Sequence, residues 1–187
     1  MTPINKKTGK CIGALPGSGP LCQLGHVFRG GEQGPLHRPE FTLLEWYRPG
    51  TDYRGMMDDT VELLRFLVHT LADLPPVVER DGRRVDLTAE AERLTVYEAF
   101  CRHAGGPPPD PSTPEGEERF FRILVEQIEP HLGVGTPTFL IDYPEQQASL
   151  AKIRPGPPAV AERAELYLAG VEICNAFSEL TDPVEQC

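Results

Sequence analysis

The sequence FRGGEQGPLHRPEFTLLEWY, residues 28–47, decides how this chain is interpreted. A strand that ends before Gly30 and a strand that starts after Pro39 would form an antiparallel pair. The connection between them is long, polar and Gly-rich. The stretch therefore predicts a hairpin, and it leaves open whether one face of that hairpin lines a pocket or is merely solvated.

The second strand of this hairpin carries a distinctive row of side chains. Because side chains alternate between the faces of a strand, Phe41, Leu43, Glu45 and Tyr47 lie on the same face. A carboxylate beside a phenol suits an ammonium group, through charge-assisted hydrogen bonds. Arg29 can fork onto a carboxylate or a phosphate. In the alternative interpretation, Glu45 and Arg29 form an ordinary ion pair on a solvated face.

A second informative stretch is ERAELYLAGVEICNAFSEL, residues 162–180. Ala169-Gly170 is predicted to be a two-residue hairpin turn. That turn would pair Leu168 with Val171, Tyr167 with Glu172, and Glu165 with Cys174. The two strands would then form the C-terminal part of the sheet.

This predicted pairing brings two carboxylates together. Glu165 and Glu172 lie diagonally on one face, where they repel each other unless a cation such as Mg²⁺, with ATP phosphates, sits between them. Asn175, Phe177 and Glu179 have the opposite parity, so they reach that face only through a bulge near Cys174–Asn175. The alternative is a half-exposed hairpin whose acidic residues face water.

Composition limits the class of protein. The 187 residues suffice for one domain with a real core, and the 40% hydrophobic and 25% charged residues are ordinary globular values. A formal net charge of −10 without a basic patch argues against dedicated nucleic-acid binding. No apolar run approaches membrane-spanning length and no signal peptide is recognised, so we expect a cytoplasmic protein without a membrane partner.

The cysteines argue against two further classes. There are five, at positions 11, 22, 101, 174 and 187, and no CxxC pair occurs. An odd count without paired spacing is atypical of a zinc site or a secreted disulfide framework. We expect reduced, mostly buried thiols.

Periodicity predicts the remaining elements. Helices are expected over Arg54–Leu74, over Ala89–His103 or part of it, and over Glu117–Leu132. A strand is expected over Thr136–Tyr143, and further strands over Ala161–Leu180. Gly105–Pro114 is a Pro-rich loop or linker and residues 155–158 are a turn. Without regular strand–helix alternation, this pattern predicts one α+β domain with an antiparallel sheet.

Together the two stretches resemble a known family. Residues 22–48 look like motif 2 of the class II lysyl-tRNA synthetases, and residues 172–180 look like their amino-acid-binding strand. The resemblance is strongest to the free-standing paralogue that attaches (R)-β-lysine to elongation factor P. Supporting details are Glu45–Pro49, Gly17–Leu24, Pro137–Phe139 and Tyr143–Ala151. The resemblance covers Gly13 to Gln186 and weakens through Pro75 to Pro114.

The resemblance implies a fold and an activity. The fold is a class II aminoacyl-tRNA synthetase catalytic domain, with an antiparallel sheet flanked by helices. The activity is ATP-dependent formation of an aminoacyl-adenylate from lysine or (R)-β-lysine, followed by transfer to a lysine of elongation factor P. ATP and Mg²⁺ are the implied cofactors, and tRNA is not an expected partner. The alternatives are a lysyl-tRNA synthetase catalytic fragment and an inactive remnant.

The resemblance also implies roles for individual residues. Arg29 would contact the α-phosphate and the substrate carboxylate, and His37 the terminal phosphates of ATP; both are candidate catalytic residues. Phe41 would stack on adenine, and Glu32 belongs to the same nucleotide-binding loop. Glu45, Tyr47 and Glu179 would hold the side-chain amine of the substrate with help from Asn175, and Phe177 is a further substrate-binding candidate. Glu165 and Glu172 would hold Mg²⁺.

Some family features differ or are not found. Gly30-Gly31 stands where the family usually has Asn-Glu, and Ala176 replaces a usual glycine. Motif 1, which builds the family's homodimer interface, and motif 3, which supplies a central strand and an ATP-binding arginine, are not recognised. We therefore expect a domain incomplete at both ends, with an open sheet edge and poor stability or activity on its own.

Overall fold

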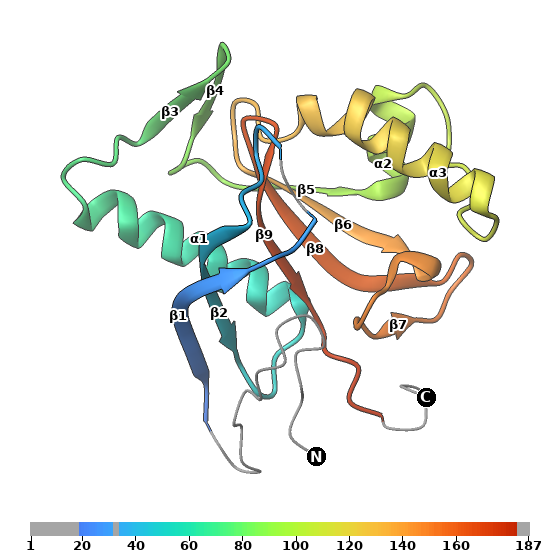
Figure 1. Cartoon of the computed structure of the whole chain (residues 1–187), viewed down its shortest axis with the longest axis horizontal. Coiled ribbons are helices and arrows are strands. Elements are labelled where there is room, and N and C mark those ends of the chain that lie inside the picture. Colours follow the sequence, from blue (N-terminus) through green and yellow to red (C-terminus); the bar gives the residue numbers. More distant parts are fainter. Residues whose placement is uncertain (1–18, 32–33, 183–187) are drawn as a thin grey trace. The chain divides into compact units, whose positions relative to one another are not determined.

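The computed structural model describes residues 19–31 and 34–182 (Figure 1). The chain divides into two compact units, residues 1–50 and 51–187. In the first, β1 (Leu21–Phe28) and β2 (Glu40–Tyr47) pair antiparallel, from Leu21 opposite Tyr47 to Phe28 opposite Glu40. The predicted hairpin is confirmed.

The second unit is built on a five-stranded sheet. Its strands are β5 (Glu92–Thr95), β6 (Thr138–Pro144), β7 (Ile153–Arg154), β8 (Val160–Leu168) and β9 (Val171–Phe177). The order is β5–β6–β8, and both β7 and β9 pair with β8. The pairs β6–β8, β7–β8 and β8–β9 are antiparallel, whereas β5 and β6 are parallel. The sheet is thus mixed: the predicted antiparallel pairing holds for all of its pairs except β5–β6.

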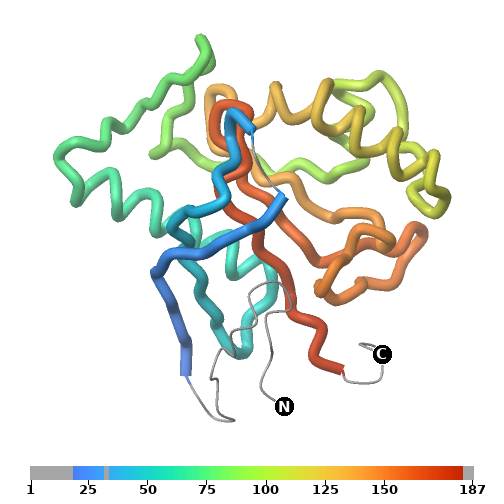
Figure 2. The backbone as a smooth tube through the Cα atoms, viewed as in Figure 1, coloured from blue at the N-terminus to red at the C-terminus, as the bar shows by residue number. Residues whose placement is uncertain are grey.

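Helices cover both faces of this sheet (Figure 1). On one face, α1 (Tyr53–Thr70) packs against β8 and β9, and its buried Tyr53 and Met57 meet Phe139, Ala164 and Leu166. Figure 2 shows the same α1 backbone beside the C-terminal strands. The N-cap of this helix is Asp52, whose side chain accepts from the Arg54 and Gly55 N–H groups.

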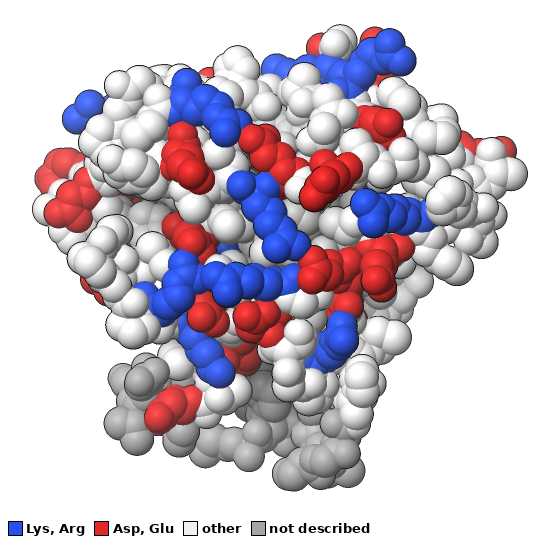
Figure 3. All heavy atoms as spheres, turned by 180° about the vertical axis from the view of Figure 1, so that it is seen from behind, with Lys and Arg blue, Asp and Glu red and all other residues white. Residues whose placement is uncertain are grey.

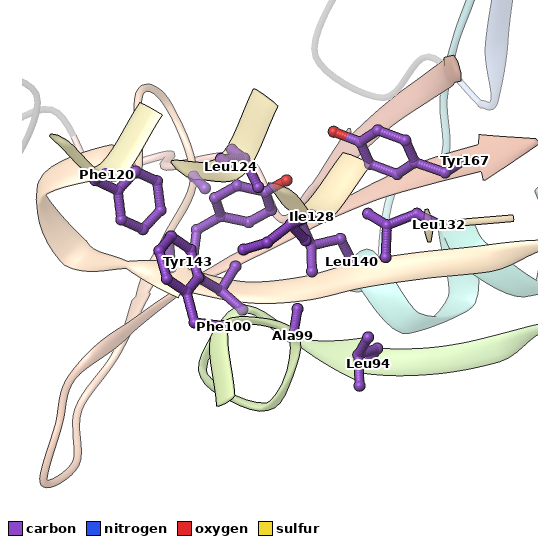
Figure 4. Close-up of a cluster of buried hydrophobic side chains, with 13 residues drawn as sticks. Leu94, Ala99, Phe100, Phe120, Leu124, Ile128, Leu132, Leu140, Tyr143 and Tyr167 are labelled. Atoms are coloured by element: carbon purple, nitrogen blue, oxygen red, sulfur yellow. The ribbon is translucent and has the colours of Figure 1, made fainter. Parts of the chain in front are cut away.

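The opposite face carries the larger core. There α2 (Val96–His103) and α3 (Pro114–Ile123) pack with a π-helical turn at Leu124–Ile128 and a 3₁₀ turn at Glu129–His131. Figure 4 shows their apolar side chains against those of the sheet. The fully buried members include Phe100, Phe120, Ile128, Leu132, Leu140, Tyr143 and Tyr167.

The prediction of a helix over Ala89–His103, or part of it, is confirmed for Val96–His103. The residues before it are not helical, because Glu92–Thr95 pairs with β6 and Thr95 caps the helix with Glu98. Another predicted helix range needs correction. The helix expected over Glu117–Leu132 starts at Pro114, since Thr113 is its N-cap, and it changes to π and 3₁₀ turns after Ile123.

One hairpin was missed. Strands β3 (Val77–Arg80) and β4 (Arg83–Asp86) pair antiparallel around Asp81 and Gly82, which have φ of 51° and 74°. Positive φ at both central residues is the geometry of the hairpin turn that Asp-Gly favours. The sequence signal was therefore present.

The thiols and the surface complete the description. Cys22, Cys101 and Cys174 are free, but Cys22 and Cys101 are exposed, so the expectation of mostly buried thiols was wrong for these two. On the face in Figure 3, acidic and basic side chains are interspersed. Within the described ranges, no helix combines the length and apolar character needed to cross a membrane.

Candidate functional site

The register of β8 and β9 brings the candidate residues of both strands onto one face. Tyr167 lies opposite Glu172, as predicted, but Glu165 lies opposite Asn175 rather than Cys174. The difference arises because Ile173 is an extra residue in β9, which makes a β-bulge. The required bulge therefore exists, slightly before the predicted Cys174–Asn175. It places Asn175 and Phe177 on the face that carries Glu165.

Glu165 is the centre of a buried hydrogen-bond network. Its residue is only 5% exposed. One carboxylate oxygen accepts from the Arg163 guanidinium and, at 3.4 Å, from Asn175 Nδ2. The other accepts from the Tyr143 hydroxyl and, at 3.0 Å, from the Tyr167 hydroxyl. A carboxylate has about four acceptor positions, so Glu165 is saturated with donors.

Two phenols and a cation thus share this carboxylate. The Arg163 guanidinium also lies 4.6 Å from the centre of the Tyr143 ring. Burial, and then the charge of Glu165, raises the pKa of the Tyr143 hydroxyl well above its usual value. Burial likewise raises the pKa of Tyr167. Both hydroxyls therefore stay protonated and act as donors.

Glu129 extends the network from the sheet to the helical layer. The Tyr167 hydroxyl lies 3.2 Å from a Glu129 oxygen and 3.0 Å from Glu165, but it has a single proton to donate. Burial, followed by the charge of Glu165, raises the pKa of Glu129. A proton retained by Glu129 would let it donate to Tyr167, and Tyr167 could then donate to Glu165.

Glu179 has the opposite kind of environment. It follows β9 and forms an isolated antiparallel bridge with Ala151. Partial burial raises the pKa of its carboxyl, and burial is the sole cause of that shift. Within the described part of the chain, no hydrogen bond or ion pair of the Glu179 carboxylate is found. A desolvated carboxylate without a partner is the kind of group that binds a cationic ligand.

The hairpin of the first unit holds the other candidates. Alternation places Phe41, Glu45 and Tyr47 on one face of β2, opposite Val27, Gln23 and Leu21 of β1. The Arg29 guanidinium lies 5.2 Å from the centre of the Phe41 ring. The half-buried Phe41 ring thus makes a cation–π contact with Arg29 inside the hairpin.

The rest of the loop is described in part. Gly34 and His37 exchange two backbone hydrogen bonds of 3.2 and 3.3 Å, which close a turn and leave the His37 side chain exposed. The candidate Glu32 lies outside the described residues.

The predicted Mg²⁺ pair is unequal. Glu172 is an exposed carboxylate, of the type that Mg²⁺ accepts as ligand. Glu165 shares its face but already accepts four hydrogen bonds. Among the described residues, no group of three or more His, Cys, Asp or Glu side chains could hold a metal. A metal at this pair would therefore depend on additional ligands, such as phosphate oxygens or water.

Comparison with known proteins decides the family. The sequence model of the tRNA synthetases class II (D, K and N) matches residues 14–187. The chain belongs to this family. Its mixed sheet with flanking helices is an α+β fold, as predicted, and the resemblance recognised in residues 22–48 and 172–180 is confirmed at the family level.

Curated relatives of this family member share a name. "Elongation factor P–(R)-β-lysine ligase" of Vibrio cholerae is 37% identical over 189 residues, covering 91% of this chain and 53% of the relative. The proteins of that name from Photorhabdus laumondii and Proteus mirabilis are 39% and 38% identical, covering 91% and 90% of this chain and 53% and 52% of their own length. The chain spans about half the length of these relatives.

Sequence reasoning missed several members of the site. Arg163 is two residues before Glu165 on the same strand, so alternation could have placed it on the same face. Tyr143 comes from β6 and Glu129 from the 3₁₀ turn. No local pattern relates these residues to Glu165, because their proximity depends on strand order.

Proposed function

We propose that this chain belongs to an ATP-dependent ligase that activates lysine or (R)-β-lysine as an aminoacyl-adenylate and transfers it to a lysine of elongation factor P. The proposal is supported by relatives of that name, which are 37–39% identical over about nine tenths of the chain. It places the enzyme in the cytoplasm, together with its protein substrate. The hairpin and the sheet unit would act as one catalytic domain.

Glu179 is the observation that carries the proposal. Its partly buried carboxylate has no partner among the described residues, and burial raises its pKa. An ammonium group supplies both a charge and donors, so it would compensate the desolvation. We propose that Glu179 binds the side-chain amine of the lysine-like substrate, and that Glu45, Tyr47, Asn175 and Phe177 are further substrate-binding residues.

The chemical step is a substitution at phosphorus. A substrate carboxylate oxygen attacks the α-phosphate of ATP, and the bond from that phosphorus to the bridging oxygen of pyrophosphate breaks. The products are the aminoacyl-adenylate and pyrophosphate. Arg29 would hold the α-phosphate and the attacking carboxylate together, which contributes positioning and charge neutralisation.

We assign the remaining nucleotide contacts to the hairpin as part of the same proposal. His37 would reach the terminal phosphates, Phe41 would stack on adenine, and Glu32 would contribute from the same loop. The contact between Arg29 and the Phe41 ring keeps both candidate nucleotide-binding side chains together in the hairpin.

Mg²⁺ is part of the proposal. Glu172 and Glu165 would hold it, and the ion would neutralise phosphate charge when bound. Because Glu165 accepts four hydrogen bonds, Glu172 is the more accessible ligand of the two. Arg163 and the phenols of Tyr143 and Tyr167 would then act mainly to keep the Glu165 carboxylate oriented.

The second step transfers the acyl group. The amine of a lysine on elongation factor P attacks the acyl carbon of the adenylate, the acyl–oxygen bond breaks, and AMP leaves while the amine loses a proton. The product is an amide. This partner is taken from the name of the relatives, and the chemistry requires an acceptor amine that is uncharged at the moment of attack.

The test is ATP–pyrophosphate exchange with the full chain, Mg²⁺, and either lysine or (R)-β-lysine. We expect amino-acid-dependent exchange, and a Glu179→Gln variant should raise the KM for the amino acid by about tenfold to a hundredfold, because a charged hydrogen bond is lost. Adding elongation factor P should then yield a protein heavier by one lysyl residue in mass spectrometry.

The matched control is Glu126→Gln, which removes an exposed carboxylate of the π-helical turn. It should leave exchange unchanged. If neither amino acid stimulates exchange in protein that is folded by circular dichroism, the result would contradict the ligase proposal and favour an inactive remnant. Acylation of tRNA in place of elongation factor P would instead identify a lysyl-tRNA synthetase fragment.

A further inference from the structure

Behind the candidate face, three polar side chains form a closed triangle. The Tyr53 hydroxyl donates to Asp142 Oδ1 at 2.8 Å. Arg154 donates to the Tyr53 oxygen at 2.8 Å and to Asp142 Oδ2 at 2.6 Å. Each contact pairs one donor with one acceptor, and one ion pair lies within the triangle. The triangle therefore joins the start of α1 to β6 and β7.

The same tyrosine contacts the segment after β9 that carries Glu179. The Tyr53 backbone N–H donates to Ser178 Oγ at 3.0 Å, although 125 residues separate the two in sequence. Ser178 is 5% exposed. Its own N–H donates to the Glu162 carbonyl at 3.0 Å, and its carbonyl accepts from the Lys152 N–H at 2.8 Å. Ser178 is thus held through its side chain and through both backbone groups.

The position of Ser178 determines the direction in which the neighbouring Glu179 side chain points. In extended chain, neighbouring side chains point to opposite faces. Ser178 points toward α1, so the side chains of Phe177 and Glu179 point toward the other face. Within the described residues the Glu179 carboxylate has no partner of its own. Its direction is therefore set by the backbone, and Ser178 fixes that backbone from behind.

We propose that Tyr53, Asp142, Arg154 and Ser178 are positioning residues that fix the direction in which Glu179 presents its carboxylate to the substrate amine. The inference rests on the proposed function, since it assigns the purpose of the cluster to amine binding. Preorganisation of this kind reduces the ordering cost that ligand binding would otherwise incur. Loosening the cluster should weaken binding of the amino acid and leave the nucleotide unaffected.

The experiment compares Tyr53→Phe, Ser178→Ala and the double variant in the full chain. The first removes the hydroxyl of the triangle, and the second removes the acceptor on the strand. Each should raise the dissociation constant for lysine, measured by calorimetry, by about fivefold, the equivalent of one hydrogen bond. Because both substitutions act on the same set of contacts, their effects should not be independent. The increase in the dissociation constant of the double variant should be smaller than the product of the two single increases.

Two features separate positioning from general destabilisation. The KM for ATP in the exchange assay should not change in the variants, whereas the KM for lysine should rise. The control is Asp58→Asn, which removes a 2.5 Å ion pair between α1 and Arg93 of β5 and should change neither constant. If Ser178→Ala does not fold, Arg154→Gln tests the same triangle at a side chain that is 34% exposed.

The outcomes are distinct. Wild-type protein that is folded but binds neither lysine nor (R)-β-lysine overturns the proposed function, and the inference with it. Wild-type binding that persists unchanged in the variants overturns the inference alone. Equal changes in the constants for lysine and ATP also overturn it, because a loosened fold would affect both.

Discussion

Glu165 of β8 and Glu179, which follows β9, are two carboxylates with opposite surroundings. Glu165 is almost inaccessible and accepts hydrogen bonds from Arg163, Tyr143, Tyr167 and Asn175. Glu179 is partly buried and has no partner among the described residues. The charge of Glu165 is balanced within the fold, whereas that of Glu179 is left for a ligand to balance.

The contrast indicates that Glu165 contributes to the stability of the fold, whereas Glu179 is available for binding a ligand. A buried charge that loses its partner is strongly destabilising, so the Glu165 region should dominate the response to mutation in unfolding experiments. A desolvated charge without a partner costs stability in the free protein and gives affinity when a cation binds. The two regions should therefore respond in opposite directions to the same Glu→Gln change.

The largest effect is expected for Glu165→Gln. The neutral amide leaves Arg163 without its ion pair and turns an acceptor toward the phenols into a donor, so the free energy of unfolding should fall by about 3 kcal/mol. Urea denaturation followed by circular dichroism measures this. The exposed Glu126→Gln should change the value by less than about 0.5 kcal/mol. A Glu165→Gln variant as stable as wild type would remove the distinction between the two regions.

A smaller effect is expected for Tyr143→Phe. The ring and its packing remain, but one donor to Glu165 is lost, so stability should fall by about 1–2 kcal/mol. The matched control is Tyr97→Phe, since Tyr97 is 58% exposed and its hydroxyl makes no described hydrogen bond. Equal losses in the two variants would mean that the hydroxyl bonded to Glu165 is not special.

The smallest effect concerns the pH dependence of stability at Glu179. Burial raises the folded-state pKa of this carboxyl above its value in the unfolded chain, about 4.3. Between these two values the folded state binds more protons, so the contribution of Glu179 to the free energy of unfolding declines as pH rises. Glu179→Gln should remove this decline, and the variant should equal or exceed wild-type stability near neutral pH.

Urea titrations of wild type and Glu179→Gln at pH 4, 5, 6 and 7 (about one pH unit apart, spanning the carboxylate range) measure the difference. The stability difference should move in favour of the variant as pH increases. A difference that moves in favour of the wild type would indicate that Glu179 has a stabilising partner in the folded protein.

Local signals predicted much of the secondary structure. The apolar period of α1 and the Ala169-Gly170 turn were readable because they depend on neighbours in sequence. The Asp81-Gly82 turn was readable by the same logic but was overlooked. Strand β5 was not, because its four residues look helical in context and its parallel partner starts at Thr138. Pairing across such distances leaves no periodic trace.

The candidate site was predicted unevenly for the same reason. The resemblance named Glu165, Asn175 and Glu179, and parity required a bulge in β9, which the structure has at Ile173. The donors that saturate Glu165 were not predicted, because Tyr143 is 22 residues away and on another strand. The contact between Tyr53 and Asp142 spans 89 residues. Such contacts follow from topology, which a residue pattern does not encode.

The irregularity of β6 ties the two regions together. The register with β8 shifts between Ile141 and Tyr143, and Asp142 has a φ of 58°. Consequently Asp142 joins Tyr53 behind the sheet while its neighbour Tyr143 joins Glu165 in front. In a redesign or recombination of this family, Asp142 and Tyr143 therefore cannot be changed independently. Inserting or deleting a single residue in β6 would exchange the carboxylate and the phenol between opposite faces of the sheet. Both hydrogen-bond networks would then be lost together.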